Sequence, residues 1–322
     1  MKIARIFGLY NICCLLYFPA FIAAQSFEAA LEADGQYFNH SLIRVNSMLV
    51  SVPVLITDVS GQKITALRIE DFRLTEDGMP VEISRLAESS NLNIALLFDV
   101  SGSVYNNFEF QQNTAIDFLQ KIWEEGDTAT IISFDDQLEV WLKNGDDLQE
   151  AMRTLRQIRP TGRTTSFFDA VVMAVRLLEQ SVSEETRQAI IVLSDGVDNT
   201  SAASLALTLT EMRRRSVVFY AINPRNEDIV RLNKTSASGQ ENLTVLANVT
   251  GGTVFVSDET RHLENIFSKI TAELRAQYLL LYYSLIPNMD GKFHTIEVSI
   301  PDQPGLNIRT RTGFLAVNSS TE

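Results

Sequence analysis

The chain has few residues of the types that carry enzyme and metal chemistry. It contains two cysteines and three histidines among 322 residues. Both cysteines, Cys13 and Cys14, lie in an apolar N-terminal segment, so the chain beyond that segment has no disulfide, thiolate zinc site or cysteine nucleophile. The sequence contains no His-Glu-x-x-His pair, no Gly-x-Ser-x-Gly elbow and no phosphate loop. These absences argue against the common hydrolase and nucleotide-binding classes.

Positive charge is also scarce. The chain has 27 lysines and arginines against 40 aspartates and glutamates, which gives a net charge of −13. Such a balance argues against nucleic acid or an anionic membrane surface as the partner. It suits a protein that holds cations.

The first residues are typical of a secretory signal peptide. Lys2 and Arg5 precede the apolar stretch Ile6–Phe18, and small residues lead to Ala24. We expect cleavage after Ala24, so that residues 1–24 are the signal peptide. An uncleaved membrane anchor is the alternative, although the apolar stretch is shorter than the about 20 residues of a membrane span. No later segment is long and apolar enough to cross a bilayer. We expect an exported protein of the bacterial periplasm, cell surface or medium.

The pattern of apolar and polar residues predicts three regions after this segment. Residues 25–90 read as short strands with turns, residues 91–278 alternate strands with amphipathic helices, and residues 279–322 return to strands. Alternation of this kind predicts an α/β fold with a doubly wound, mainly parallel sheet. Each flank has too few strands to be stable alone. We expect residues 40–90 and 279–322 to pair into one β-sandwich-like domain; two separate small modules are the alternative.

Four local patterns give more specific expectations. Val81–Leu86 alternates as one strand, and Asn307–Val317 reads as another. Leu243–Asn248 is typical of a short helix. Asp135-Asp136 reads as a solvated turn.

The most informative stretch is an apolar strand that ends in oxygen-bearing side chains. Ile94–Phe98 is followed by Asp99, Ser101 and Ser103. A short, continuous apolar run is typical of a buried parallel strand, and open α/β sheets bind ligands at the carboxyl ends of their strands. Carboxylate and hydroxyl oxygens suit hard cations such as Mg²⁺. The Asp-x-Ser-x-Ser pattern resembles the metal-ion-dependent adhesion site of von Willebrand factor A (VWA) domains.

The family pattern also includes a threonine in a loop before a helix and an aspartate after a later strand. Asp195, followed by a glycine, comes directly after the apolar strand Ala189–Leu193 and Ser194. Thr164 and Thr165 lie in a loop before a helix. The distance to that helix favours Thr165, whereas the Gly-Arg-Thr pattern favours Thr164; of the two we prefer Thr165.

The resemblance implies a Rossmann-like VWA domain over residues 91–278 with a divalent cation site. The implied ligands are Asp99, Ser101, Ser103, Thr165 (or Thr164) and Asp195. Mg²⁺ is the preferred cation, with Mn²⁺ and Ca²⁺ as alternatives. Two segments of the flanks, Leu67–Gly78 and Asn307–Phe314, resemble the flanks of a bacterial secreted subgroup of VWA proteins often noted in Acidobacteria. A domain whose site has degenerated and holds no metal is the alternative.

The resemblance also implies a function. We expect an exported protein-binding or adhesion module, not an enzyme, whose cation binds an Asp or Glu carboxylate on a partner protein. In the family the last helix, here Leu263–Tyr278, can shift and couple the site to neighbouring domains. Two alternatives stay open: a metal-assisted hydrolase that uses the same carboxylates, and a scaffold whose β flanks bind partners while the VWA domain is inert.

Overall fold

The computed structural model describes residues 48–87, 91–102, 108–179, 186–225, 227–256, 260–286 and 290–317. The signal peptide expected at residues 1–24 and the expected ligand Ser103 lie outside these ranges. Within them, every helix is too short or too polar to span a bilayer.

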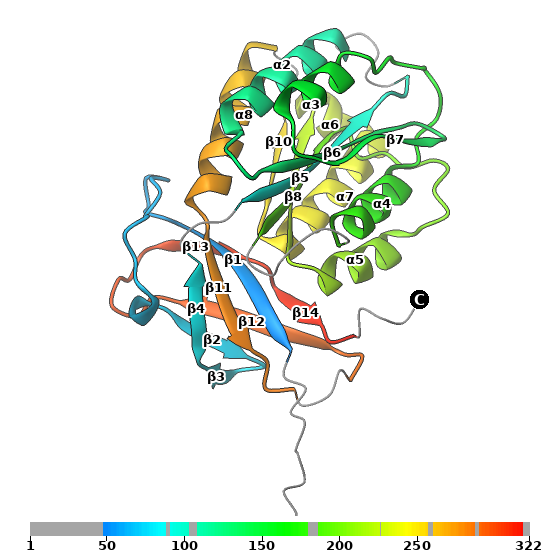
Figure 1. Ribbon diagram of the computed structural model, residues 1–322. Coiled ribbons are helices and arrows are strands. Elements are labelled where there is room, and N and C mark those ends of the chain that lie inside the picture. The colour runs from blue at the N-terminus through cyan, green and yellow to red at the C-terminus, as the bar shows by residue number, and fades with distance from the viewer. Residues whose placement is uncertain are drawn as a thin grey trace, which may run out of the picture. The chain divides into compact units, whose positions relative to one another are not determined.

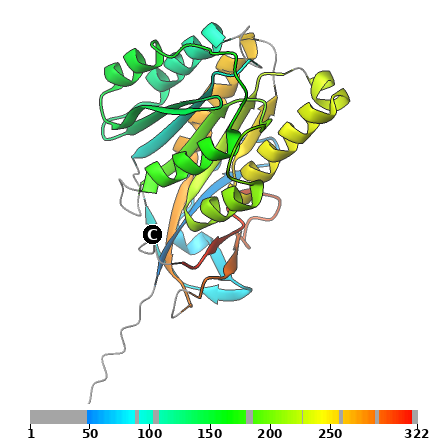
Figure 2. The same ribbon diagram turned by 90° about the vertical axis from the view of Figure 1, so that its right-hand side faces the viewer.

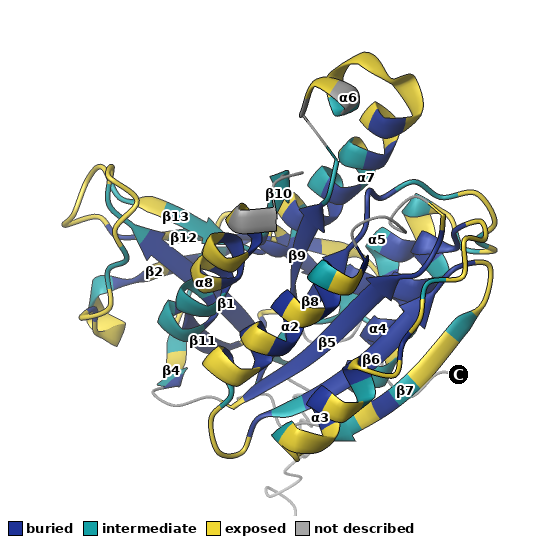
Figure 3. Cartoon of the chain, turned by 90° about the horizontal axis from the view of Figure 1, so that it is seen from above, coloured by how far each residue is buried: buried dark blue, intermediate teal, exposed yellow. Residues whose placement is uncertain are grey.

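The middle region forms a six-stranded sheet with the order β10-β9-β8-β5-β6-β7. Its strands are β5 (Leu92–Asp99), β6 (Thr128–Phe134), β7 (Leu138–Gly145), β8 (Arg187–Leu193), β9 (Val217–Asn223) and β10 (Thr253–Val256). All neighbours run parallel except β6 and β7. Every residue of β5 is buried, as the apolar run predicted, because helices cover both faces of the sheet (Figure 3).

Helices on each face of this sheet enclose a separate apolar core. One face packs against α2 (Phe108–Ile122), α3 (Leu148–Leu155) and α8 (Thr260–Ala276) (Figure 1). The other packs against α4 (Phe167–Glu179), α5 (Leu205–Arg214) and α7 (Lys234–Thr250), the face turned toward the viewer in Figure 2. The short helix α6 (Glu227–Leu232) precedes α7. The doubly wound α/β fold predicted from the sequence is therefore confirmed.

Strands from the two flanks build two further antiparallel sheets, with the orders β13-β1-β11-β4 and β14-β12-β2-β3. The N-terminal flank supplies β1 (Leu49–Thr57), the 3-10 helix η1 (Ile69–Asp71), β2 (Arg73–Glu76), β3 (Met79–Val81) and β4 (Ile83–Ala87). The C-terminal flank supplies β11 (Tyr278–Tyr283), β12 (Phe293–Ser299), β13 (Asn307–Thr310) and β14 (Gly313–Leu315). Both sheets contribute to one apolar core. The β-sandwich expected from paired flanks is confirmed, and the alternative of two separate modules is wrong.

Three of the local predictions need correction. Val81–Leu86 is divided between β3 and β4, and Asn307–Val317 between β13 and β14, with the two parts of each in different sheets. Strands of both sheets alternate toward the same core, so the pattern does not show where the chain changes sheet. The short helix at Leu243–Asn248 is the end of the 17-residue helix α7, whose polar first half hides its helical pattern.

The second change of sheet places a buried arginine between the sandwich and the α/β domain. The Arg311 side chain donates to the carbonyls of Gly313 and Arg213, both at 2.8 Å, and to the Ser216 hydroxyl at 2.6 Å. Arg311 is 4% exposed. Gly313 belongs to the sandwich, whereas Arg213 and Ser216 lie at the end of α5 and before β9. One guanidinium therefore links the two parts of the fold.

Candidate metal-binding site

The two predicted carboxylate ligands lie where the order of the strands reverses. From β5 the chain builds outward through β6 and β7, and then returns to the other side of β5 to add β8, β9 and β10. Asp99 ends β5, and Asp195 follows the end of the neighbouring strand β8. Open α/β sheets form a ligand crevice at this switch point. The topology therefore explains why residues 96 positions apart in the sequence point to one site.

Asp99 is a buried carboxylate with a strongly perturbed pKa. Its Oδ1 accepts a hydrogen bond from the Ser101 N–H at 2.9 Å, and its Oδ2 accepts one from the Ser194 hydroxyl at 2.7 Å. Burial raises the pKa of Asp99 to about 6, opposed by the hydrogen bonds from Ser101 and Ser194 and reinforced by the charge of Asp195. If the buried carboxylates of Asp99 and Asp195 are both ionised, they need a positive charge nearby.

The other described candidates line one cavity of about 330 Å³. Ser101, Thr165 and Asp195 all contribute to its wall, as does Thr164. Thr165 is buried and Thr164 is exposed. The structure thus brings four of the five expected ligands to the switch point, and the fifth, Ser103, lies outside the described residues.

Backbone hydrogen bonds join the three loops that carry these side chains. The Gly102 N–H donates to the Arg163 carbonyl at 3.2 Å, which joins the loop after β5 to the threonine loop. The N–H of Asn199, in the loop after β8, donates to the Thr165 carbonyl at 2.9 Å. The candidate ligands are therefore held in place by the fold itself.

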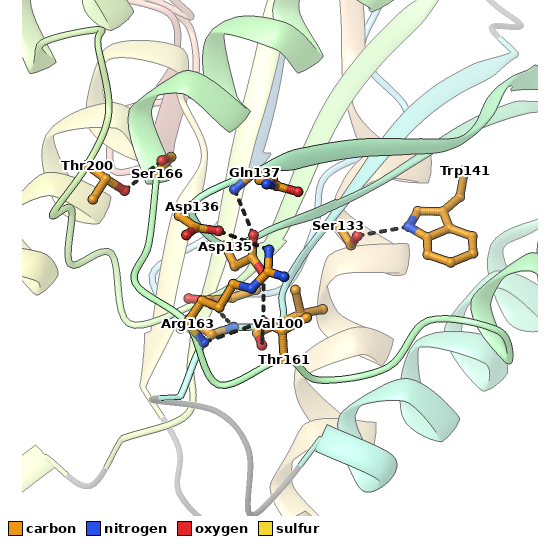
Figure 4. A network of polar contacts seen from close by, with 12 residues as sticks. Val100, Ser133, Asp135, Asp136, Gln137, Trp141, Thr161, Arg163, Ser166 and Thr200 are labelled. Carbon is orange, nitrogen blue, oxygen red and sulfur yellow. Dashed lines mark hydrogen bonds and ion pairs between the residues drawn. The ribbon is translucent and has the colours of Figure 1, made fainter.

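Asp135 also holds the threonine loop, and the solvated turn predicted at Asp135-Asp136 is wrong for this residue. Asp135 is buried, and its Oδ2 accepts a hydrogen bond from the Thr161 hydroxyl at 2.6 Å (Figure 4). Its carbonyl accepts another from the Ser166 N–H at 2.6 Å. Burial would raise the pKa of Asp135, but hydrogen bonds, led by that from Thr161, hold it below its usual value. The available signal was its position directly after β6, the neighbour of β5.

Arg225 is the principal site residue that the sequence analysis missed. Its Nε and Nη2 lie 2.6 Å and 2.5 Å from Oδ2 of Asp195. The other oxygen of Asp195, Oδ1, accepts the Val197 N–H at 3.2 Å. The Asp195 side chain is 2% exposed and that of Arg225 is 32% exposed. Arg225 closely follows the end of β9, the neighbour of β8, which is the signal that could have identified it.

Helix α7 packs unusually closely against the loop that carries Asp195. Gly196 has a φ of +71°, and a Cβ built on it would lie 2.4 Å from the Gly239 carbonyl oxygen. The Asn242 side chain donates to the Gly196 carbonyl at 3.0 Å. Only glycine combines this backbone conformation with this approach.

The donor set fits a hard divalent cation. The candidate ligands offer carboxylate and hydroxyl oxygens, which suit Mg²⁺, Mn²⁺ or Ca²⁺ better than the nitrogen and sulfur ligands that zinc prefers. In the described part of the chain, no group of three or more His, Cys, Asp or Glu side chains is placed so that it could hold a metal ion. A cation here would therefore rely on two carboxylates and the hydroxyls beside them.

Comparison with known families agrees with this geometry. Residues 93–269, more than half of the chain, match the sequence profile of the von Willebrand factor type A domain. The chain belongs to the VWA domain family. VWA domains commonly bind a divalent cation and often act in adhesion or protein binding. No curated protein matches the chain in sequence.

Several solved structures are similar to part of the chain. Proximal thread matrix protein 1 from the mussel byssus is 19% identical, with a TM-score of 0.48 over 59% of this chain and 47% of that one. A second structure of the mussel protein, with a zinc-occupied MIDAS motif, is 19% identical, with a TM-score of 0.49 over 62% and 49% of the two chains. An aerotolerance-related membrane protein from Bacteroides fragilis is 14% identical, with a TM-score of 0.46 over 57% and 99%. The chain spans about half the length of the mussel protein.

Proposed function

We propose that this protein is an exported binding module that attaches to an acidic group of a partner protein through a divalent cation. The proposed ligands are Asp99, Ser101, Ser103, Thr165 and Asp195. The observation that carries the proposal is the meeting of two buried carboxylates with hydroxyl groups at the switch point of the VWA sheet. Export is supported by the signal-like pattern of residues 1–24.

Each type of ligand has a distinct part in this proposal. Asp99 and Asp195 supply negative charge, whereas the hydroxyls of Ser101 and Thr165 supply neutral oxygen atoms. Neutral ligands leave much of the cation's charge unbalanced. When bound, the cation offers that charge and an open coordination position to a carboxylate on the partner, which is an oriented, charge-assisted contact. The burial of Thr165 supports it over Thr164 as the threonine ligand.

The wall of the cavity supports an acidic partner group. Arg163 lines it, as does the first turn of α7. Asn233 caps this helix, and its Oδ1 accepts from the N–H groups of Thr235 and Ser236 at 2.9 Å and 3.1 Å. A helix N-terminus carries a partial positive charge. A carboxylate that enters the cavity therefore meets positive charge from the protein as well as from the cation.

We propose binding instead of catalysis because of the residue types in the cavity wall. The described residues of the cavity wall include no histidine, cysteine or lysine that could act as a base or nucleophile. The one carboxylate among them, Asp195, is engaged by Arg225.

Calorimetric titration with MgCl₂, MnCl₂ and CaCl₂ tests the cation site. The wild-type chain should bind Mg²⁺, and Asp99→Ala should lose that binding, because one of the two charged ligands is gone. Asp302→Ala removes an exposed carboxylate from the sandwich and serves as the matched control, with wild-type affinity expected. Equal Mg²⁺ binding by wild type and Asp99→Ala would overturn the assignment.

Capture of partners from the cell envelope or medium then tests the function. The immobilised wild-type chain in Mg²⁺ should retain proteins that are lost with EDTA and with Asp99→Ala. Blocking carboxylates on the captured protein should also release it. Capture that is identical in all three conditions would favour a scaffold whose β flanks bind the partner.

A further inference from the structure

We propose that Arg225 competes with the divalent cation for Asp195, so that cation binding releases the Arg225 side chain from the site. This inference rests on the proposed function, since it requires a cation site at Asp99 and Asp195.

The ion pair places the guanidinium of Arg225 on one oxygen of Asp195, and both residues line the cavity. The Nε–H of Arg225 donates to Oδ2 of Asp195 at 2.6 Å, and Nη2 of the same guanidinium lies 2.5 Å from that oxygen. Two guanidinium nitrogens therefore lie against that one oxygen. The remaining oxygen, Oδ1, already accepts the Val197 N–H. A cation that binds the Asp195 carboxylate therefore meets two oxygens that already have partners.

Charge makes the two occupants mutually unfavourable. Asp195 is buried, so an interaction there is screened weakly by water. In this structure Arg225 neutralises the charge of Asp195. A divalent cation bound between Asp99 and Asp195 would bring two positive charges beside the guanidinium. Because one carboxylate cannot balance both, the cation must offset the loss of this ion pair.

The structure also shows which part of Arg225 can leave. The backbone N–H of Arg225 donates to Oδ1 of Asn223 at 3.0 Å. The Nδ2 of Asn223 in turn donates to Oε1 of Gln240 on α7 at 2.8 Å. Asn223 is fully buried. The backbone of Arg225 is thus fixed to α7, while about a third of its side chain is exposed to solvent. The release is therefore a rotation of the side chain into water and requires no rearrangement of the loop.

The test compares wild type with Arg225→Met, which keeps much of the side-chain volume and removes the charge. Arg231→Met is the matched control, because Arg231 is exposed on the neighbouring helix α6. Titration with MgCl₂ alone should show Arg225→Met binding about tenfold more tightly than wild type, since hydrogen bonds to charged groups contribute strongly. In EDTA the variant should melt at a lower temperature than wild type, because Asp195 loses its counter-ion, and Mg²⁺ should remove this difference. Arg231→Met should match wild type in both measurements.

The outcomes separate this inference from the function on which it rests. Arg225→Met that binds Mg²⁺ with wild-type affinity, or more weakly, overturns the competition and leaves the cation site standing. Mg²⁺ binding by neither wild type nor Arg225→Met overturns the proposed function together with the competition. Binding by the variant alone supports the competition in its strongest form.

A measurement on the wild-type chain covers the case in which Arg225→Met does not fold. The Nε–H resonance of Arg225 can be followed by nitrogen-15 NMR during a MgCl₂ titration and assigned with Arg225→Lys. Displacement predicts that this resonance moves toward the position of a solvent-exposed arginine as the cation binds. An unchanged resonance at saturating Mg²⁺ overturns the inference.

Discussion

Replacing Gly196 with alanine measures how much the close packing of α7 contributes to the site. Two separate costs act at this position. A φ of +71° is unfavourable for an L-residue, and the added Cβ would lie 2.4 Å from the Gly239 carbonyl oxygen. The contact is with backbone of a helix, so no side-chain rotation relieves it. Either α7 or the loop with Asp195 must shift.

A substitution at a second glycine separates the cost of the positive φ from the cost of the close contact. Gly162 has a φ of +78°, but a Cβ there would meet nothing within 4 Å. Gly162→Ala should therefore show the backbone cost alone, about 1–2 kcal/mol. Gly196→Ala adds an overpacking cost of about 1–3 kcal/mol, which gives a total of about 2–5 kcal/mol.

Urea denaturation followed by tryptophan fluorescence is the appropriate assay. Both tryptophans, Trp123 and Trp141, pack against the same core of the VWA domain, so the signal reports the domain that contains both glycines. Gly196→Ala should also bind Mg²⁺ more weakly, since the loop with Asp195 moves. Equal loss of unfolding free energy in Gly196→Ala and Gly162→Ala would refute the argument that the close approach of α7 matters.

Three further outcomes follow from buried polar groups. Arg311→Met should lower the free energy of unfolding by about 3–5 kcal/mol in urea, because the Gly313 and Arg213 carbonyls and the Ser216 hydroxyl lose a donor whose charge is buried. Asp135→Ala should weaken Mg²⁺ binding in calorimetry although Asp135 is not a proposed ligand, because Thr161 and its loop lose their anchor. His294 should make the stability of the sandwich depend on pH in thermal melts. Burial opposes its charge, but Asp290 and Asp77 raise its pKa above 6.5, and it lowers the pKa of both carboxylates.

The direction of the pH effect follows from these shifts. The His294 contribution is complete below pH 6.5, its unfolded pKa, and is lost as pH rises through the higher folded value. The contributions of Asp77 and Asp290 are complete above pH 3.8 and are lost as pH falls through their lowered values. The cluster therefore stabilises the sandwich most between these limits. His294→Gln should flatten the loss above pH 6.5, and an unchanged profile would contradict the assignment.

Controls and contrary results are available for the other two substitutions. Arg73→Met removes an exposed arginine from β2 and should cost less than about 1 kcal/mol; a cost equal to that of Arg311→Met would show that burial is not the cause. Asp136→Ala removes the exposed neighbour of Asp135 and should leave Mg²⁺ affinity near wild type. Equal weakening by Asp135→Ala and Asp136→Ala would point to net charge and not to the loop anchor.

The movement of the last helix of the VWA domain, α8, stays a prediction. α8 ends one residue before β11 begins, so any shift of α8 would act directly on the sandwich. Its last turn is fixed by Arg275, which binds Asp127 and the Ile122 carbonyl. Arg275→Met should loosen this attachment. Hydrogen exchange in α8 that is unaffected by Mg²⁺ in both wild type and variant would argue against coupling.

The sequence by itself determined the fold class, the alternation of strands and helices in the middle region, and the residue types of the candidate site. It could do so because these features are local: apolar runs such as Ile94–Phe98 bury themselves as strands, and polar residues directly after them lie at the carboxyl edge of the sheet. The pairing of the two flanks was also predictable, because neither flank has enough strands to be stable alone.

Only the tertiary structure decided which side chains contact the candidate ligands and hold their loops. The ion pair of Arg225 with Asp195, the burial of Asp135, the choice between Thr164 and Thr165 for the buried position, and the changes of sheet around Arg311 all depend on contacts between distant segments. An arginine after β9 is close to an aspartate after β8 only because the strands are neighbours in space. Sequence pattern records which side of a strand is apolar, but not which distant side chain neutralises a buried charge.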